Sequence, residues 1–511
     1  MDIDALRGEI NKINEELLVL LEKRLQLCRD IALEKAARNT PVLNEEREAE
    51  ILEAVRRSSK PGLSEYNAEL FSQLMRVSRK YQNDLLFASG GEMKCGLIGK
   101  TLVHSWSKPI HKALGDYSYE LYSLAEDEVE AFVREKPFTG MNVTIPYKEK
   151  VLPLCNTVCD TVKKTGSVNT LIKSPDGSIC GCNTDYEGFL YMVKRSGIVL
   201  EGKKILVLGS GGASKTVCAA ARNAGAREII VISRRGENNY ENLAAHSDAQ
   251  VIVNATPVGM YPENGAVPVS LDMFEALEGV IDLVYNPLRT RLVLEARQRG
   301  IKCTGGLEML VSQASASAKL FGGDFRSDTD FLVKQFYESF GNLVLVGMPG
   351  SGKTTIGAEV AARMGVPFYD TDRLIELAYS MSVPEIFEKH GEKEFRRAEK
   401  EIIAQAGKRN GCVIAVGGGA VLDRENYYSL AGNGTICFLE CPLEELETEG
   451  RPLSGNMEAL EKMYEQRWPL YMAFADFSVK NDDAVRTVCA RMRSGYSSHG
   501  RSDCGENNRK G

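Results

Sequence analysis

The sequence lacks several features that would place the protein in a specialised class. It has no run of about 18 uncharged apolar residues, so a membrane-spanning helix is not expected. It has no block of lysines and arginines that could follow a nucleic-acid backbone, and the net charge is only −7. Five histidines are too few for a His-rich metal site. The start, Met1-Asp2-Ile3-Asp4, is acidic and differs from a signal peptide. The composition, with 43% hydrophobic and 26% charged residues, is that of a soluble globular protein.

Cysteine usage points the same way. Thirteen cysteines are an odd count in a long chain, which indicates reduced thiols and a cytoplasmic location. Cys155, Cys159, Cys180 and Cys182 are close in sequence, but they contain no C-x₂-C pair. A zinc site is therefore not expected among them.

Hydrophobic periodicity divides the 511 residues into blocks with different sequence patterns. The first block has apolar residues at three- and four-residue steps from Ile3 to Ile31, with breaks at Pro41 and Pro61-Gly62, and contains helices only. Two later blocks alternate short apolar runs with helical stretches, which is typical of α/β domains. The predicted divisions are a helical domain (1–87), a linker (88–93), a first α/β block (94–335), a second α/β block (341–493) and a disordered tail (494–511).

The most specific motif is the G-x-x-x-x-G-K-T sequence from Gly347 to Thr354. It follows the apolar run Leu343–Val346 and precedes a helical pattern, so backbone N–H groups can close on a polyphosphate. Lys353 would reach the outer phosphates, and Thr354 would hold Mg²⁺. The motif predicts ATP binding by Gly347, Gly350, Ser351, Gly352, Lys353, Thr354 and Thr355.

A second glycine loop lies in the first α/β block. Gly209-Ser210-Gly211-Gly212-Ala213 follows the apolar strand Lys204–Leu208, and we expect Gly209, Gly211, Gly212 and Ala213 to approach a dinucleotide. The next strand ends in Ser233-Arg234-Arg235, with no carboxylate for a ribose. Two guanidinium groups there suit a 2′-phosphate, so NADPH is favoured over NADH. Alternatively, both arginines are surface residues at a strand end.

The helical block carries charged residues on one face. Arg24 and Lys35 differ by only about 20° around a helix. Their positions suit either a solvated face of a dimerising coiled coil or an anion site. The block resembles the all-helical chorismate mutase family, in which an intertwined dimer clamps a dicarboxylate. This resemblance implies Lys35 and Gln82 as catalytic donors to the ether oxygen and a homodimer in which Arg7 comes from the partner chain. It implies substrate binding by Arg7, Arg24, Arg47, Glu48 and Ser78.

The first α/β block contains the motifs Ser105-Trp106-Ser107, Asn142–Lys148, Asn183-Thr184-Asp185, Asn254–Met260 and Asp282–Pro287. With these motifs the block resembles shikimate dehydrogenase over about 94–335. The resemblance implies a substrate lobe (about 94–195), a Rossmann lobe (about 196–310) and C-terminal helices that return to the substrate lobe. It implies Lys148 and Asp185 as the catalytic dyad. It assigns the substrate to Ser105, Ser107, Thr144, Asn169, Tyr285 and Gln313.

The second α/β block resembles shikimate kinase from about 341 to 490. This resemblance implies that Asp372 orients the acceptor hydroxyl and that Asp370 assists Mg²⁺ together with Thr354. It gives Lys353 and Arg451 the transferring phosphoryl group, and it assigns substrate binding to Arg396, Gly418, Gly419 and Arg467. The acidic approach to Arg451, Glu444–Gly450, departs from the longer basic lid of relatives. We expect weakened ATP binding from it.

Together the resemblances imply a multidomain, trifunctional enzyme of aromatic amino-acid biosynthesis. It would reduce 3-dehydroshikimate with NADPH, phosphorylate shikimate with ATP and Mg²⁺, and rearrange chorismate to prephenate. Two alternatives stay open: the helical block is a non-catalytic dimerisation or feedback module, or the last block regulates or acts on another small alcohol.

Overall fold

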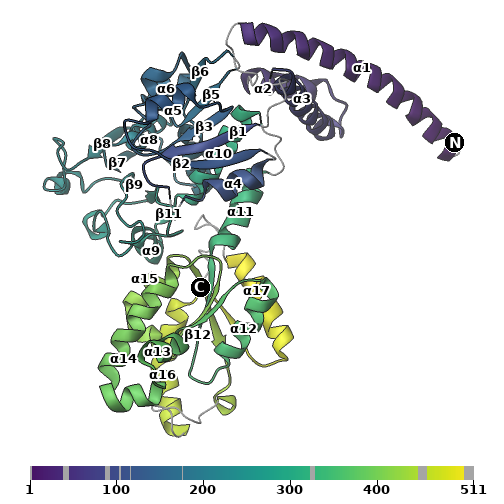
Figure 1. Cartoon of the computed structure of the whole chain (residues 1–511). Helices are drawn as coiled ribbons and strands as arrows, with labels where there is room; N and C mark the ends of the chain where they lie inside the picture. The colour runs from purple at the N-terminus through teal and green to yellow at the C-terminus, as the bar shows by residue number, and fades with distance from the viewer. Residues whose placement is uncertain are drawn as a thin grey trace. The chain divides into compact units, whose positions relative to one another are not determined.

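A computed structural model describes residues 3–37, 45–86, 93–102, 105–115, 117–174, 176–322, 328–446 and 457–499. The chain forms two compact units, one of Met1–Gly188 with Val311–Thr329 and one of Phe189–Leu310 with Asp330–Gly511. Figure 1 shows the course of the chain from the N-terminal helices to the C-terminal α/β domain. Among the described residues, no helix combines the length and apolarity needed to cross a membrane.

The N-terminal block is helical, as its periodicity predicts. It consists of α1 (Ile3–Ala37), α2 (Glu45–Ser58) and α3 (Ser64–Leu86), and α3 packs against both other helices. The first half of α1 extends beyond them (Figure 1). Its apolar side chains are exposed, including Ile10 at 55% and Leu17 at 46%. The apolar stripe of α1 is therefore only partly covered within one copy of the chain.

The substrate lobe of the first α/β block is built on a six-stranded sheet of order β2-β1-β3-β5-β6-β4. Strand β5 runs antiparallel to both of its neighbours, β3 and β6, while the other neighbouring pairs are parallel. Phe321 of α10 packs with Cys95 and Leu97 of β1, so this helix joins the lobe from later in the chain. The elements are β1 (Lys94–Gly99), α4 (Ser107–Leu114), β2 (Ser118–Ser123), α5 (Val129–Glu135), β3 (Gly140–Val143), η1 (Leu152–Leu154), β4 (Thr157–Val158), α6 (Asp160–Thr165), β5 (Thr170–Lys173), β6 (Ile179–Cys182), α7 (Asp185–Ser196) and α10 (Leu307–Phe321).

The glycine-loop lobe, residues 196–310, is a parallel five-stranded sheet of order β11-β10-β9-β7-β8. Its central strand β7 is the apolar run found in the sequence, and every residue of it is buried. A strand buried on both faces needs such a continuous apolar run. The elements are β7 (Lys204–Leu208), α8 (Gly212–Asn223), β8 (Glu228–Ile232), η2 (Leu243–His246), β9 (Val251–Asn254), η3 (Leu271–Met273), β10 (Gly279–Asp282), α9 (Arg291–Gln298) and β11 (Lys302–Thr304).

The P-loop domain, residues 341–499, has three layers. The middle layer is a parallel sheet of order β13-β14-β12-β15-β16, and helices form the two outer layers. Leu343 and Leu345 of β12 pack with α12 and α17, whereas Val344 and Val346 belong to a cluster with α14, α15 and α16. Alternate residues of a strand face opposite layers, so β12 is covered on both sides. Helix α11 (Thr329–Phe340) precedes the domain. The elements of the domain are β12 (Asn342–Val346), α12 (Lys353–Met364), β13 (Phe368–Asp370), α13 (Thr371–Tyr379), α14 (Val383–Gly407), β14 (Val413–Ala415), η4 (Ala420–Leu422), α15 (Arg424–Ala431), β15 (Gly434–Glu440), η5 (Leu443–Glu445), α16 (Met457–Phe474), β16 (Phe477–Lys480) and α17 (Val485–His499).

Two expectations from the sequence are wrong. The helix α17 continues past Arg493 to His499, so the predicted disordered tail begins with helical residues. The cysteines are not all reduced thiols, because Cys159 and Cys182 form a disulfide. Their spacing of 23 residues gave no signal, since the strand pairing of β4 and β6 brings them together.

Within the second unit, the segment before α9 binds the turn between α15 and β15. The buried Arg289 donates from Nε to the carbonyl of Ala431 at 3.0 Å and from Nη2 to that of Gly434 at 2.7 Å. Its own N–H donates to the carbonyl of Gly432 at 2.9 Å, and that of Leu288 donates to Asn433 Oδ1 at 2.9 Å. The glycine-loop lobe and the P-loop domain therefore share a buried, hydrogen-bonded contact.

We expect Arg289→Ala to destabilise the P-loop domain by roughly 3 kcal/mol. Hydrogen bonds from a charged donor contribute about 1.5–3 kcal/mol each, and the change leaves two carbonyls without their donor. Thermal inactivation of the P-loop domain's activity would then occur several degrees lower than in the unaltered chain. The matched control is Arg299→Ala, because Arg299 pairs with the exposed Asp272 at 2.9 Å and such pairs contribute about 0–1 kcal/mol. Equal temperatures of half-inactivation for the two variants would contradict the role given to Arg289.

Candidate functional site

The P-loop predicted from the sequence has the backbone that a phosphate cradle needs. Gly350 and Gly352 have φ of 85° and 82°, which side chains rarely tolerate, and Gly352 precedes the first turn of α12. Lys353 is buried, and its Nζ donates to the carbonyls of Gly347 at 3.0 Å and Met348 at 2.8 Å. The loop therefore holds the Lys353 ammonium group through two of its own backbone carbonyls.

Two acidic residues lie beside this loop. Thr354 Oγ1 donates to Asp370 Oδ2 at 2.6 Å, so the residues predicted to assist Mg²⁺ are in contact. Asp370 also caps α13 by accepting from the N–H groups of Asp372 and Arg373. Burial, with the nearby Asp370 carboxylate, raises the pKa of Asp372 to about 6. Asp372 Oδ1 is buried and accepts no hydrogen bond from the described residues.

The opposite wall of the same cavity carries arginines. Arg467 Nη1 and Tyr471 Oη both donate to the carbonyl of Gly418, at 3.1 and 2.6 Å. A side chain at Gly419 would collide with the guanidinium of Arg396, since a Cβ there would lie 2.2 Å from Nη1. The cavity has a volume of about 790 Å³. It is lined by Gly350, Gly352, Lys353, Thr354, Thr355, Asp370, Asp372, Arg396, Gly418, Gly419 and Arg467 among others.

Sequence reasoning missed Glu399 in this cavity. Glu399 Oε2 accepts from Arg396 Nη1 at 2.7 Å, and burial raises the pKa of Glu399 to about 7. A Cβ at Gly417 would lie 2.6 Å from Asp372 Oδ1 and 2.8 Å from Glu399 Oε1. Gly417 therefore leaves room for two buried carboxyl groups. Glu399 lies three residues after Arg396 on α14, and its burial is visible only in the fold.

Arg451 and part of the acidic approach to it lie outside the described residues. The hypothesis of weakened ATP binding therefore stays a prediction.

In the substrate lobe, the predicted dyad is a close ion pair. Lys148 Nζ donates to Asp185 Oδ2 at 2.5 Å, and the two side chains are 16% and 9% exposed. Asp185 begins α7, directly after the buried Asn183 and Thr184. Asn183 Nδ2 donates to the carbonyl of Ser167 at 2.9 Å, which fixes the start of the helix. The lobe thus presents one ammonium and one carboxylate at a rigid position.

Asn169 links this dyad to the centre of the sheet. Its Oδ1 accepts from the N–H of Thr184 at 2.7 Å, and its Nδ2 donates to Thr184 Oγ1 at 3.0 Å. Asn142, which sequence reasoning gave no separate role, donates to Thr170 Oγ1 at 3.2 Å and accepts from Tyr119 Oη at 2.8 Å. A polar network with these partners holds the strand ends in one arrangement.

The remaining predicted substrate residues are distributed over both units. Ser105 and Ser107 are neighbours, with Oγ atoms 3.1 Å apart, and Thr144 and Gln313 are half-buried in the first unit. Tyr285 lies in the second unit, in the segment that leads to Arg289. The Asn254 and Asp282 motifs contact each other within the second unit, where Asn254 Nδ2 donates to Asp282 Oδ1 at 2.9 Å.

The glycine loop of the second unit follows β7 as expected. Gly209 has φ of 106°, and Gly211 is the N-cap of α8. The helix N-terminus, with Gly212 and Ala213, is therefore exposed to a phosphate from the carboxyl end of the sheet. Ser233 directly follows β8, and Arg234 and Arg235 form the exposed turn after it. This arrangement fits an added 2′-phosphate.

The helical block brings several predicted residues together. Arg24 Nη1 donates to Ser78 Oγ and, at 3.3 Å, to the carbonyl of Leu74. Gln82 is buried, and its Oε1 accepts no hydrogen bond from the described residues. Burial lowers the pKa of Lys35, and the nearby Glu48 opposes this effect. Arg24, Lys35, Glu48 and Ser78 therefore lie where α1 meets α2 and α3, and the buried Gln82 follows Ser78 by about one turn of α3.

Two predicted residues do not join this region in one copy of the chain. Arg7 pairs with the exposed Asp4 at 3.2 Å near the start of α1, and Arg47 pairs with the exposed Glu50 at 2.8 Å. Arg79 was missed, although it directly follows Ser78, and it pairs with Glu48. Glu48 is thereby oriented before any ligand binds.

In the comparison with known proteins, three family models match three separate segments of the chain. The family model of chorismate mutase type II matches residues 6–83, that of the shikimate dehydrogenase substrate-binding domain matches 97–171, and that of shikimate kinase matches 349–494. The shikimate dehydrogenase (NADP(+)) of Clostridium perfringens strain 13 is 34% identical over 249 residues, which cover 45% of this chain and 92% of the relative. The chain belongs to the shikimate dehydrogenase family.

A second member of this family, the shikimate dehydrogenase (NADP(+)) of Methanopyrus kandleri, is 36% identical over 45% of this chain and 90% of its own length. Among solved structures, a chorismate mutase/shikimate 5-dehydrogenase fusion protein from Clostridium acetobutylicum is 35% identical, with a TM-score of 0.44, and is matched over 48% of this chain and 96% of its own. The family membership applies to the middle of the chain. The helical and P-loop parts carry separate family matches.

Proposed function

We propose that the protein is a trifunctional enzyme of the shikimate pathway. It reduces 3-dehydroshikimate to shikimate with NADPH, phosphorylates shikimate to shikimate 3-phosphate with ATP, and rearranges chorismate to prephenate. The observation that carries the proposal is the presence of three separate polar sites, each of which overlaps the segment matched by the corresponding family. A cytoplasmic location, where NADPH and ATP are supplied, is part of the proposal.

The decisive experiment is one coupled assay of the purified chain with 3-dehydroshikimate, NADPH, ATP and Mg²⁺. Loss of NADPH absorbance together with shikimate 3-phosphate in the mass spectrum supports the two α/β activities at once. Shikimate that accumulates without phosphorylation refutes the kinase assignment, and constant NADPH refutes the dehydrogenase assignment. Omitting Mg²⁺ tests the metal separately.

For the dehydrogenase, NADPH supplies a hydride to the carbonyl of the substrate. Lys148 supplies the proton to the developing alkoxide, and Asp185 orients Lys148 and stabilises its charge through the 2.5 Å contact. Ser105 and Ser107 hold the carboxylate, while Thr144, Asn169, Tyr285 and Gln313 bind the hydroxyl groups or close the pocket. Gly209, Gly211, Gly212 and Ala213 receive the pyrophosphate, and Ser233, Arg234 and Arg235 receive the 2′-phosphate.

For the kinase, ATP binds the P-loop, and Lys353 stabilises charge on the transferring phosphoryl group. Asp372 accepts the proton of the acceptor hydroxyl, while Arg396 and Arg467 bind the substrate carboxylate across the cavity. Mg²⁺ fits the residues present, since Thr354 Oγ1 and Asp370 Oδ2 are oxygen atoms of the kind that bind Mg²⁺ and lie 2.6 Å apart beside the phosphate loop. Arg451 completes the phosphate contacts in this proposal.

For the mutase, the protein needs only to hold the folded conformer of chorismate and stabilise charge on its ether oxygen. Lys35 and the buried Gln82 are the donors for that oxygen, and Arg24, held by Ser78, binds a carboxylate. A homodimer supplies Arg7 from the second copy. The exposed apolar stripe on the first half of α1 supports the dimer, which sedimentation velocity would detect.

We expect Arg24→Ala to lower chorismate mutase turnover by roughly 10²–10³-fold, because one charge-stabilising donor is lost. The conversion of chorismate to prephenate is followed by absorbance. The control is Arg57→Ala, because Arg57 lies exposed on α2 and pairs with the exposed Glu53. A chain without mutase activity that still dimerises would favour the alternative, in which the helical block is a dimerisation module.

A further inference from the structure

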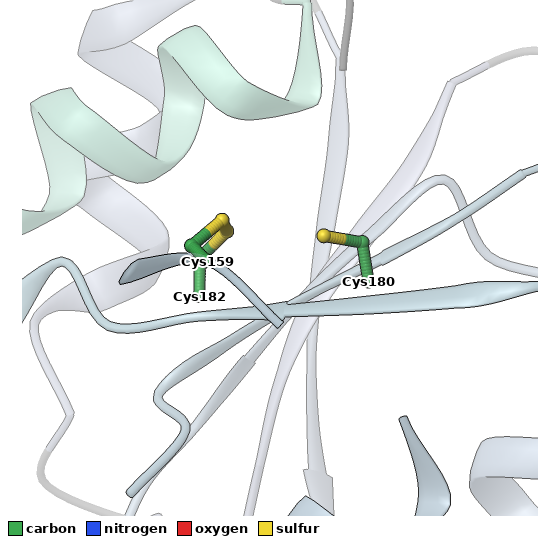
Figure 2. Close-up of side chains that lie close together, drawn as sticks. All are labelled: Cys159, Cys180 and Cys182. Carbon is green, nitrogen blue, oxygen red and sulfur yellow. A yellow bond between two sulfur atoms is a disulfide. The ribbon is translucent and has the colours of Figure 1, made fainter. Parts of the chain in front are cut away.

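Three cysteines form a thiol site in the substrate lobe that none of the proposed activities uses. Cys159 and Cys182 are joined by a disulfide, and Cys180 is a free, half-buried thiol. The Sγ atoms of all three lie within 4.8 Å of one another. Cys180 lies two residues before Cys182 on β6, and Figure 2 shows its sulfur directed toward the disulfide. We propose that this site is a reversible oxidation site that reacts with small dithiols and disulfides.

The disulfide joins two segments that also hold the start of α7. Cys159 is the N-cap of α6, and its N–H donates to the carbonyl of Gly181 on β6 at 2.9 Å. From the same helix, Thr161 Oγ1 accepts from the N–H of Asn183 at 3.3 Å. The disulfide and these hydrogen bonds therefore join the same two segments. Together they position Asn183, two residues before Asp185.

The other end of the disulfide contacts the substrate network through the backbone. The carbonyl of Cys182 accepts from the N–H of Asn169 at 3.1 Å, and Asn169 Oδ1 accepts from the N–H of Thr184 at 2.7 Å. The closed loop between the bridged cysteines thus includes Asn169 and ends beside the Lys148–Asp185 pair. Closing a loop of this length stabilises the folded arrangement against the open chain.

The chemistry balances with a dithiol as the reductant. A thiolate of the dithiol attacks Sγ of the half-buried Cys159, breaks the S–S bond and releases Cys182 as a thiolate. The second thiol of the reductant then displaces Cys159, so that two electrons and two protons reach the protein and the dithiol becomes a disulfide. Cys180 lies close enough to attack Cys159 Sγ itself, which transfers the bridge along β6 without net oxidation.

The test uses the full chain, equilibrated with oxidised or reduced dithiothreitol, then alkylated, digested and mapped by mass spectrometry. We expect a peptide pair linked through Cys159 and Cys182 after oxidation, and its loss after reduction. The Cys159→Ser variant should never show the pair, while Cys155→Ser should keep it, because Cys155 is a free, half-buried thiol of the same lobe. No such linked pair in the oxidised chain would overturn the proposal.

A second readout rests on the proposed dehydrogenase activity. Reduction should lower the temperature of half-inactivation of the dehydrogenase by several degrees in the unaltered chain and in Cys155→Ser, with no effect in Cys159→Ser. The kinase activity of the same samples should keep its midpoint, since its site lies in the other unit. An equal effect of reduction on Cys159→Ser would overturn the proposal. So would stoichiometric zinc in the reduced chain that Cys159→Ser loses, because the three sulfurs would then form a metal site. Failure of the proposed function would instead leave the peptide map unchanged.

Discussion

Replacing Lys148 with alanine is expected to lower the dehydrogenase kcat by roughly 10²–10⁴-fold, the contribution of a positioned general acid. Lys148 Nζ lies 2.5 Å from Asp185 Oδ2, and both side chains are largely buried. No other described lysine pairs with Asp185. Hydride transfer to a carbonyl without a proton donor would leave an alkoxide in a partly desolvated pocket, which is costly. Steady-state NADPH oxidation with 3-dehydroshikimate measures the loss.

The chain offers two controls for this experiment. Lys150 lies two positions further along, more exposed, and pairs with Glu126 at 3.3 Å, so Lys150→Ala should retain activity. The kinase activity of the same preparation reports whether the rest of the chain is folded. If Lys148→Ala raises KM while kcat stays unchanged, Lys148 binds substrate and does not transfer the proton.

The elements with strong local signals could be predicted from the sequence. The strands β7 and β12 are continuous apolar runs followed by glycine loops, and their burial in the structure follows from composition alone. The three helices of the first block follow from spacing and proline positions. The ATP loop and the Lys148–Asp185 pair were found through motifs whose members lie close in sequence or match a family.

What could not be predicted depends on contacts between distant segments. Arg289 binds carbonyls more than a hundred positions away, and its sequence neighbours give no hint of this. The Cys159–Cys182 bridge depends on the pairing of β4 with β6. Glu399 was missed because glutamate in a helix is ordinarily exposed, and only the fold shows that its position is buried.

Asp372 offers the sharpest test of the kinase. Burial, with the charge of Asp370, raises the pKa of Asp372 to about 6. As the proton acceptor, Asp372 acts in its ionised form, which dominates above this pKa and is lost as the pH falls through it. The kinase kcat/KM, which reports ionisations of the free enzyme, should therefore fall about tenfold per pH unit below pH 6. A pH–rate profile with shikimate and saturating ATP measures this limb.

We expect Asp372→Asn to lower the kinase rate by roughly 10²–10⁴-fold and to remove the acidic limb near pH 6. Glu359→Gln serves as the control, because Glu359 lies on α12 and pairs with Arg363. The pKa of the neighbouring Glu399 is raised to about 7 by burial, so its titration is the competing explanation of an acidic limb. Since Glu399 accepts from Arg396 at 2.7 Å, its protonation would weaken substrate binding through that arginine. The acidic limb could therefore persist in the residual activity of Asp372→Asn and disappear in Glu399→Gln. That result would show that the pH dependence arises from binding of the substrate carboxylate and not from proton transfer.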